Sequence, residues 1–165
     1  MPFFPKQYFS IDSSKTAKQF FEVLKQNVID SSILTYLKDE QKKLTGSINE
    51  PNFIVTRNIR PNHNGFAPSL FGKATQKEKG IHIEIEIQQQ TMLKIFITFC
   101  LCFLSFVLGA VVLNLEAIPN PIFYIVPIIM IICLLLIVRV SFLYEAPRSK
   151  AVFLDVIGEQ YEEDI

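Results

Sequence analysis

Two long apolar stretches constrain this chain more than any other feature of its sequence. Residues 95–115, IFITFCLCFLSFVLGAVVLNL, contain no charge in 21 positions, and residues 121–138, PIFYIVPIIMIICLLLIV, contain none in 18. An α-helix rises about 1.5 Å per residue, so each stretch is long enough to cross a hydrocarbon core of about 30 Å. Two buried core helices are the alternative, but a chain of 165 residues cannot cover apolar side chains on every face of both. We therefore expect transmembrane helices over about residues 93–115 and 121–139.

The connection between the two stretches, residues 116–120, is only five residues long. The helices should therefore form an antiparallel hairpin with both flanks on one side of the membrane. Lys94 precedes the first stretch, and Arg139, Arg148 and Lys150 follow the second, whereas the connection carries one acid and no base. The positive-inside bias predicts that both termini are cytoplasmic. The first 15 residues lack the apolar segment of a signal peptide, so we expect no cleaved leader.

Within the hairpin, the sequence indicates packing rather than transport. Cys102, Ser105 and Gly109 are spaced to share one face of the first helix, where small side chains let a second helix approach closely. Pro127 lies deep enough in the second stretch to bend its helix. Neither stretch contains an acidic or basic side chain of the kind that marks transport paths, so we expect an anchor. All three cysteines lie in these stretches and suggest neither disulfides nor a zinc site.

The N-terminal part is typical of a strand followed by a helix. Residues 7–11, QYFSI, form a strand candidate, and residues 12–29 repeat apolar side chains at helical spacing, with Asp12, Ser13 or Ser14 as candidate caps. The next residues, 30–43, are compatible with a second short helix that ends in a solvated run of charges.

Strand periodicity begins at Leu44. Residues 44–48 and 52–59 flank a short segment of turn composition, which predicts a hairpin. The clearest strand is GIHIEIEIQ, residues 80–88, in which four isoleucines alternate with polar side chains. This alternation gives one buried face and one solvated face.

The expected partner of that strand is FAPSLFGKAT, residues 66–75. Pairing Gln76 with Ile81 across a tight turn places Lys73 opposite Glu84 on the solvated face. A slip by two residues keeps the faces and moves the lysine to the next glutamate of the strand. Both registers place small residues among the isoleucines and pair opposite charges.

The strand directions place the loop RPNHNG, residues 60–65, at the membrane end of the sheet. The strand of residues 80–88 runs into the first apolar stretch without a breaker, so it points at the bilayer, and each hairpin reverses the direction. We therefore expect a basic membrane-proximal contact surface made of Lys42, Lys43, Arg57, Arg60 and His63. The alternative is that the prolines, asparagines and glycine of this loop serve turn geometry alone.

A last helix is expected after the second stretch. Residues 145–160 carry an apolar stripe of Ala151, Leu154 and Ile157, and Pro147 suits the first turn of a helix. We expect this amphipathic helix to pack back on the sheet.

The predicted fold class is an α+β membrane protein. A cytoplasmic domain of residues 1–90 contains the N-terminal strand and helix and an antiparallel sheet of about four to five strands. A transmembrane hairpin over residues 92–138 follows, and the C-terminal helix completes the cytoplasmic domain.

The segment GSINEPNFIVTRNIRPNHNGFAPSLFGK, residues 46–73, resembles a large group of short uncharacterised bacterial membrane proteins with two transmembrane helices. The resemblance covers roughly residue 44 to the C-terminus. Members typically have Arg-Asn-Ser before the Phe-x-Pro element, where this chain has His63, Asn64 and Gly65. The resemblance implies an α+β domain interrupted by the hairpin in a bacterial inner membrane, and it implies no particular activity. It is carried by Gly46, Ile48, Phe53, Ile54, Arg57, Asn64, Phe66, Pro68 and Gly72.

Catalytic chemistry finds no support in the sequence. His63 and His82 lie 19 residues apart, at expected opposite ends of the sheet, and every cysteine lies in an apolar stretch. Neither a metal-ligand pattern nor a nucleophile constellation nor a phosphate loop is recognisable. With 16 basic and 16 acidic residues, the chain has no basic excess for nucleic acid. We therefore expect neither an enzyme nor a cofactor.

Two non-enzymatic functions remain. The first is a membrane-anchored binding or sensing module that recognises anionic lipid headgroups or an unidentified membrane protein through its basic membrane-proximal surface. Each lysine or arginine there would contribute about 1 kcal/mol toward anionic lipid. The alternative is a small accessory or immunity-type protein that acts through its transmembrane hairpin. The sequence favours the first function and carries no signal for the oligomeric state.

Overall fold

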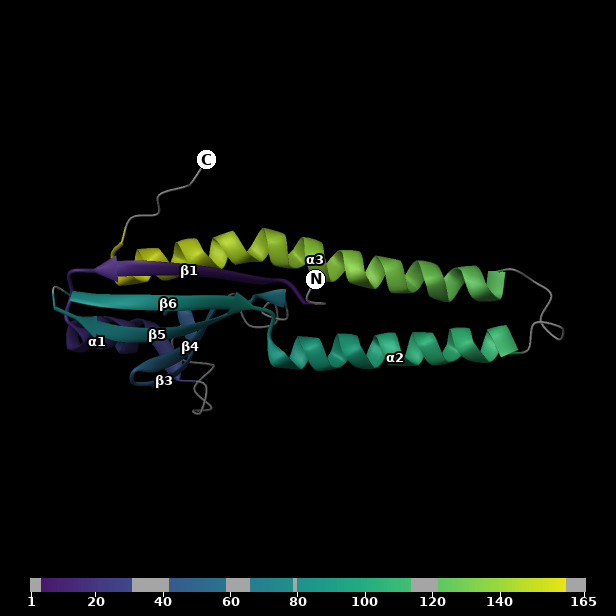
Figure 1. Ribbon diagram of the computed structural model, residues 1–165, viewed down its shortest axis with the longest axis horizontal. Coiled ribbons are helices and arrows are strands. Elements are labelled where there is room, and N and C mark those ends of the chain that lie inside the picture. Colours follow the sequence, from purple (N-terminus) through teal and green to yellow (C-terminus); the bar gives the residue numbers. More distant parts are fainter. Residues whose placement is uncertain (1–3, 31–41, 59–65, 79, 114–121, 160–165) are drawn as a thin grey trace.

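The computed structural model describes residues 4–30, 42–58, 66–78, 80–113 and 122–159. Figure 1 shows two long helices that project side by side from one end of a sheet, and the second of them continues along the sheet. This part of the chain contains β1 (Lys6–Ser13), α1 (Ala17–Asn27), β2 (Val28–Asp30), β3 (Leu44–Asn49), β4 (Asn52–Arg57), β5 (Ser69–Lys77), β6 (Gly80–Gln88), α2 (Thr91–Leu113) and α3 (Ile122–Ile157). The predicted α+β class is confirmed.

The strands form one mixed sheet with the order β1-β6-β5-β4-β3-β2. All described neighbours are antiparallel except β2 and β3, which are parallel. The predicted hairpins β3–β4 and β5–β6 are present, and Gln76 pairs with Ile81, as in the first predicted register. The sheet is larger than the expected four to five antiparallel strands. One reason is that Val28 and Ile29, expected at the end of the first helix, leave it and pair with β3 together with Asp30.

The first helix begins later than the candidate caps suggest. Thr16 is the N-cap, and its hydroxyl accepts a hydrogen bond from the Gln19 N–H while the Gln19 side chain accepts one from the Thr16 N–H. This capping box satisfies two of the amide groups that a helix leaves unpaired at its start. Asp12 and Ser13 do not cap the helix because they belong to β1, where they pair with β6.

The core lies on one face of the sheet, which α1 and α3 cover together. The four isoleucines of β6 are almost fully buried there, as their alternation predicts. Phe53 of β4 stands between the two helices, with its ring centroid 5.7 Å from that of Phe20 and 5.6 Å from that of Phe153. Gly72 leaves the space beneath this ring, since a Cβ there would lie 1.9 Å from Phe53 Cζ. The aromatic cluster therefore joins α1, the sheet and α3.

The expected C-terminal helix is not a separate element. The second apolar helix continues without interruption from Ile122 to Ile157, so residues 145–157 are its last turns and Pro147 lies inside it. Proline removes one helical hydrogen bond, but Pro147 lies on the exposed side of α3, where water can hydrate the carbonyl group left without its donor. Packing of Phe142, Ala146 and Phe153 at helical spacing maintains the helix across the proline.

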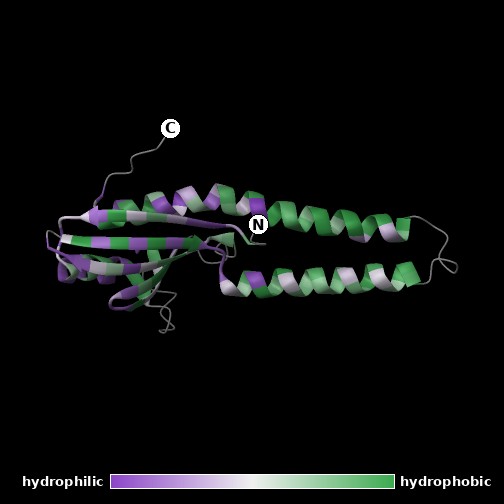
Figure 2. Cartoon of the chain, in the orientation of Figure 1, coloured by the Kyte–Doolittle hydropathy of each residue, from purple (hydrophilic) through white to green (hydrophobic). Residues whose placement is uncertain are grey.

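The other long helix, α2, follows β6 after only Gln89 and Gln90. Both α2 and α3 contain windows apolar enough to cross a membrane, and only 6% and 17% of the residues in these windows are buried. Core helices of a soluble protein would be largely covered, whereas the colouring in Figure 2 marks most residues of both helices outside the sheet as hydrophobic. By length, composition and exposure, the two helices fit the predicted transmembrane hairpin.

Candidate binding surfaces

The predicted basic surface lies partly within the described residues, and each described member has an intramolecular partner. The Lys42 Nζ lies 3.4 Å from the Val28 carbonyl oxygen, the Lys43 ammonium pairs with Asp155 near the end of α3, and the Arg57 guanidinium pairs with Glu145 of α3. Arg60 and His63 lie outside the described residues. The described lysines and arginine therefore do not form a group of unpaired charges.

Arg57 is the member whose position departs most from the expectation. It follows Phe53 and Val55 at alternate positions of β4, so its side chain enters the face that the helices cover. Only 19% of the Arg57 side chain and 16% of the Glu145 side chain are exposed. The structure thus corrects the assignment of Arg57 as a membrane contact, because this arginine joins the sheet to α3.

The ends of the predicted membrane-proximal loop have the expected place in the sheet. Thr56 pairs with Ser69, and Ser69 pairs with Gln88, three residues before α2. The last residues of β4 and the first of β5 therefore lie at the end of the sheet next to the hairpin. Residues 60–65 themselves are outside the described residues.

The predicted helix-contact face on α2 does not meet α3. Cys102 and Ser105 are exposed, and a Cβ built on Gly109 would have no heavy atom within 4 Å. The buried residue of α2 is Ile97, which lies on a different side of the helix, and α3 buries Pro127 and Val138. The three small residues thus face outward from the hairpin instead of forming its internal contact.

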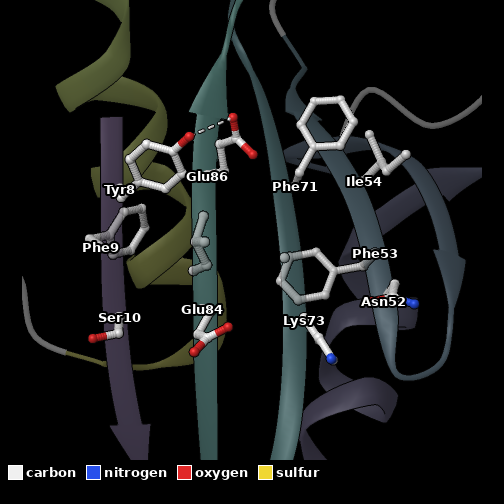
Figure 3. Close-up of a pocket in the computed structure, with 12 residues that line it drawn as sticks. Tyr8, Phe9, Ser10, Asn52, Phe53, Ile54, Phe71, Lys73, Glu84 and Glu86 are labelled. Carbon is white, nitrogen blue, oxygen red and sulfur yellow. Dashed lines mark hydrogen bonds between the residues drawn. The ribbon is translucent and has the colours of Figure 1, made fainter. Parts of the chain in front are cut away.

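A surface that the sequence analysis did not single out lies on the other face of the sheet. We call it the open face, because α1 and α3 lie on the opposite side in Figure 3. A shallow hollow of about 760 Å³ is centred on this face. Apolar side chains occur on it next to acidic and basic ones. Those that point outward into the hollow are Tyr8, Ser10, Asn52, Ile54, Phe71, Lys73, Glu84 and Glu86.

The hollow has apolar and charged parts arranged in rows across the strands. Tyr8, Glu86, Phe71 and Ile54 lie opposite one another on β1, β6, β5 and β4. The next row away from the hairpin is polar.

Glu86, in the first row, has two partners. The Tyr8 hydroxyl donates a hydrogen bond of 3.1 Å to Glu86, and the Lys6 ammonium lies 2.6 Å from the same carboxylate. This hydrogen bond from Lys6 holds the pKa of Glu86 below its usual range, so Glu86 is ionised at neutral pH.

A second polar cluster lies at the end of the open face far from the hairpin. Asp12 accepts hydrogen bonds from Lys77 at 2.8 Å and contacts His82 Nδ1 at 2.7 Å. The hydrogen bond from Lys77, followed by that from His82, lowers the pKa of the Asp12 carboxyl. Among the described residues, no group of three or more histidine, cysteine, aspartate or glutamate side chains is arranged to hold a metal ion. The contacts of Asp12 with Lys77 and His82 join β1, β5 and β6 at this exposed end of the sheet.

The sequence contains an indication of the hollow that the alternating pattern of the strands did not reveal. Ile54 and Phe71 occupy solvated positions of alternating strands, and each is large and apolar. An apolar side chain on a predicted solvated face is ordinary when it stands alone. The two become neighbours only because β4 pairs with β5 in the observed register.

No protein-family model, curated protein or solved structure matches the chain significantly.

Proposed function

We propose that this chain is a non-enzymatic, membrane-anchored binding or sensing module. Its hairpin crosses a bacterial inner membrane, and its sheet and both termini lie in the cytoplasm. The charge distribution around the hairpin supports this orientation, and the exposed apolar surface of α2 and α3 supports membrane insertion. The absence of a recognisable catalytic pattern in the sequence supports a binding role.

The observation that carries the proposal is the short connection between hairpin and sheet. Only Gln89 and Gln90 separate β6 from α2, and α3 is one helix from the hairpin to the far end of the sheet. Gln89 is buried, and its amide group lies 3.5 Å from the Val138 carbonyl oxygen of α3. A simple anchor needs only a flexible linker, whereas this connection fixes both the height and the orientation of the sheet above the bilayer.

The open face is the surface that best fits such a module. The described members of the predicted basic surface are paired within the fold, so they offer little charge to a partner. The strands run along the axis of the hairpin, so the open face stands upright on the membrane (Figure 1). A flat bilayer surface cannot cover an upright face. We therefore propose that its partner is another protein of the same membrane, which presents apolar side chains toward Tyr8, Ile54 and Phe71.

Affinity capture of the tagged chain from native membranes tests this function. The double variant Tyr8→Ser with Ile54→Thr removes apolar surface from the open face and keeps residues compatible with a strand. It should lose a stoichiometric partner that the natural chain retains. The matched variant Ser105→Leu with Gly109→Leu changes only the exposed face of α2 and should retain it.

The same experiment distinguishes the alternative function. An accessory or immunity-type protein that acts through its hairpin would lose its partner in the α2 variant and keep it in the open-face variant. If both variants capture the same proteins as the natural chain, the open face is not the binding surface.

A further inference from the structure

Arg139 is the charged residue that ends the second apolar stretch of the sequence. The apolar outer surface of α3 continues beyond it. Val140, Leu143 and Tyr144 follow it at helical spacing and are 62%, 63% and 56% exposed. They continue the outward side of the helix that Leu136 and Ile137 form within the hairpin. Beyond them the same side becomes polar, with Arg148 and Asp155 exposed. The apolar stripe of α3 thus extends above the hairpin along the sheet.

The height of this stripe follows from the position of α3 beside α2. The end of α2 and the beginning of α3 lie level with each other in Figure 1, so the 23 residues of α2 bring Thr91 level with Tyr144, the 23rd residue of α3. The charge-free stretch of α2 begins at Ile95, four residues or about 6 Å below Thr91. A bilayer has a headgroup layer of about 5 to 8 Å outside its hydrocarbon core on each side. Side chains lean toward the N-terminus of their helix, which for α3 is toward the bilayer, so the Tyr144 ring lies within this layer.

The length of α3 agrees with this placement. The 17 residues from Ile122 to Val138 rise about 26 Å, which is less than the hydrocarbon thickness of about 30 Å. The 23 residues from Ile122 to Tyr144 rise about 35 Å, and α2 also has 23 residues. If the part of α3 that lies in the hydrocarbon core and the headgroup layer ends at Tyr144, α2 and α3 cross the same depth of bilayer.

The charges at this level are positive and directed outward. The Arg148 guanidinium stacks over the Tyr144 ring at 3.7 Å from its centroid and donates a hydrogen bond to the Tyr144 hydroxyl. Arg139 is also exposed, two and a half turns below Arg148 and on the opposite edge of the stripe. Among the described residues, Glu145 forms a 4.0 Å ion pair with Arg148, but it is mostly buried and also paired with Arg57. Two arginines therefore remain for anions outside the chain.

We propose that the outer side of α3 from Arg139 to Arg148 is a phospholipid-binding surface that lies in the headgroup layer. Val140, Leu143 and Tyr144 contact the upper acyl chains and glycerol groups, and the guanidinium groups of Arg139 and Arg148 bind lipid phosphates. Tyrosine at this level is typical of the aromatic belt of membrane proteins, and arginine matches phosphate oxygens in geometry. This inference rests on the proposed insertion of the hairpin and does not depend on the open face.

The depth of the stripe can be measured by fluorescence, because the chain contains no tryptophan. Three single variants, Tyr144→Trp, Tyr8→Trp and Phe106→Trp, place one fluorophore at the stripe, on the open face and in the middle of α2. Each full-length variant is reconstituted into phosphatidylcholine vesicles that carry a nitroxide on the headgroup or bromine on the acyl chains. The headgroup nitroxide should quench Tyr144→Trp several-fold more strongly than Tyr8→Trp.

The mid-helix variant separates this inference from the proposed function. If acyl-chain bromine does not quench Phe106→Trp, the hairpin is not inserted and the proposed anchoring fails. If Phe106→Trp is quenched while Tyr144→Trp is as weakly quenched as Tyr8→Trp, anchoring holds and the headgroup contact of α3 is wrong. Protection of Tyr144→Trp in a dimer of the chain would assign the stripe to a second copy and would also overturn the proposal.

The arginines are tested by lipid retention. Each arginine near an anionic surface contributes about 1 kcal/mol, which corresponds to about fivefold in affinity. The double variant Arg139→Gln with Arg148→Gln should retain many-fold less phosphatidylglycerol than the natural chain in native mass spectra of the purified protein. The control, Lys25→Gln with Lys73→Gln, removes two charges from exposed positions of α1 and β5 and should retain the natural amount. Equal retention by both variants would exclude phosphate binding by the two arginines.

Discussion

Residues 122–137 and residues 138–157 belong to one helix but have different surroundings. In the first half, only Pro127 is buried, and large apolar side chains are exposed on nearly every side. In the second half, buried residues recur at helical spacing on the side toward the sheet, and the outer side changes from apolar residues up to Tyr144 to charged residues from Arg148 onward. This contrast fits the proposed insertion, in which the first half of α3 faces lipid and the second half faces the sheet and water.

The difference shows how one helix can have two sources of stability. In a bilayer, apolar side chains face lipid tails that are as apolar as themselves, so burial against protein gains little from the hydrophobic effect. In water, each apolar side chain buried against the sheet contributes roughly 1.5 to 3 kcal/mol. The second half of α3 should therefore respond to side-chain truncation much more strongly than the first.

The largest expected effect is at Phe153, in the second half. Phe153→Ala removes a fully buried ring that stacks on Phe53 and should lower the free energy of unfolding by about 3 to 5 kcal/mol. Leu136→Ala, on the exposed side of the first half, should change it by less than about 1 kcal/mol. Chemical unfolding of the full chain in detergent measures both. Similar losses at both positions would abolish the distinction between the two halves.

Two glycines extend the comparison to the rest of the molecule. Gly72→Ala should destabilise the chain by about 1 to 3 kcal/mol, because the new Cβ would overlap the Phe53 ring in the packed core. Gly109→Ala in α2 meets no neighbouring atom and removes a poor helix former, so it should be neutral or stabilising by up to about 1 kcal/mol. Thermal unfolding of both variants in the same detergent gives the contrast, and tolerance of Gly72→Ala would show that the aromatic cluster can relax.

Two ion pairs of the second half should differ in strength according to their burial. Glu145→Gln leaves the mostly buried Arg57 without its partner and should cost about 1 to 3 kcal/mol. Asp155→Asn affects a pair whose side chains are more than half exposed and should cost less than about 1 kcal/mol. Unfolding titrations at low and high salt measure both, and only the Asp155 pair should weaken as salt rises. A larger loss from Asp155→Asn would contradict the role of Arg57 in joining the sheet to α3.

The smallest expected effect is the pH dependence at the far end of the open face. Because Lys77 and His82 lower the pKa of Asp12 below its usual value of 3.8, ionised Asp12 is favoured in the folded state. Its contribution to stability is complete above that usual value and is lost as the pH falls through the lowered one. Asp12→Asn should therefore lower stability slightly at pH 6 and by less at pH 2 to 3. An equal difference at both pH values would show that the carboxylate is not stabilised by folding.

The sequence by itself determined the elements whose pattern is local. Alternation of four isoleucines defines β6, and the same alternation with a short turn limits its register against β5 to two possibilities, of which the structure shows the first. The absence of charge over two long stretches defines the exposed parts of α2 and α3. In each case the side chains that carry the pattern lie within one or two neighbouring elements, so their period is enough to predict the structure.

Tertiary structure decided the features that depend on residues far apart in the chain. Pro147 suits the start of a helix, yet α3 runs through it because Phe142, Ala146 and Phe153 pack continuously on the sheet. Arg57 looked like part of a basic surface, but its partner Glu145 lies 88 residues away. Which face of the sheet the helices cover, and therefore which side chains line the open face, depends on where α3 returns. A periodic pattern gives the two faces of a strand, and only long-range packing decides which one is covered.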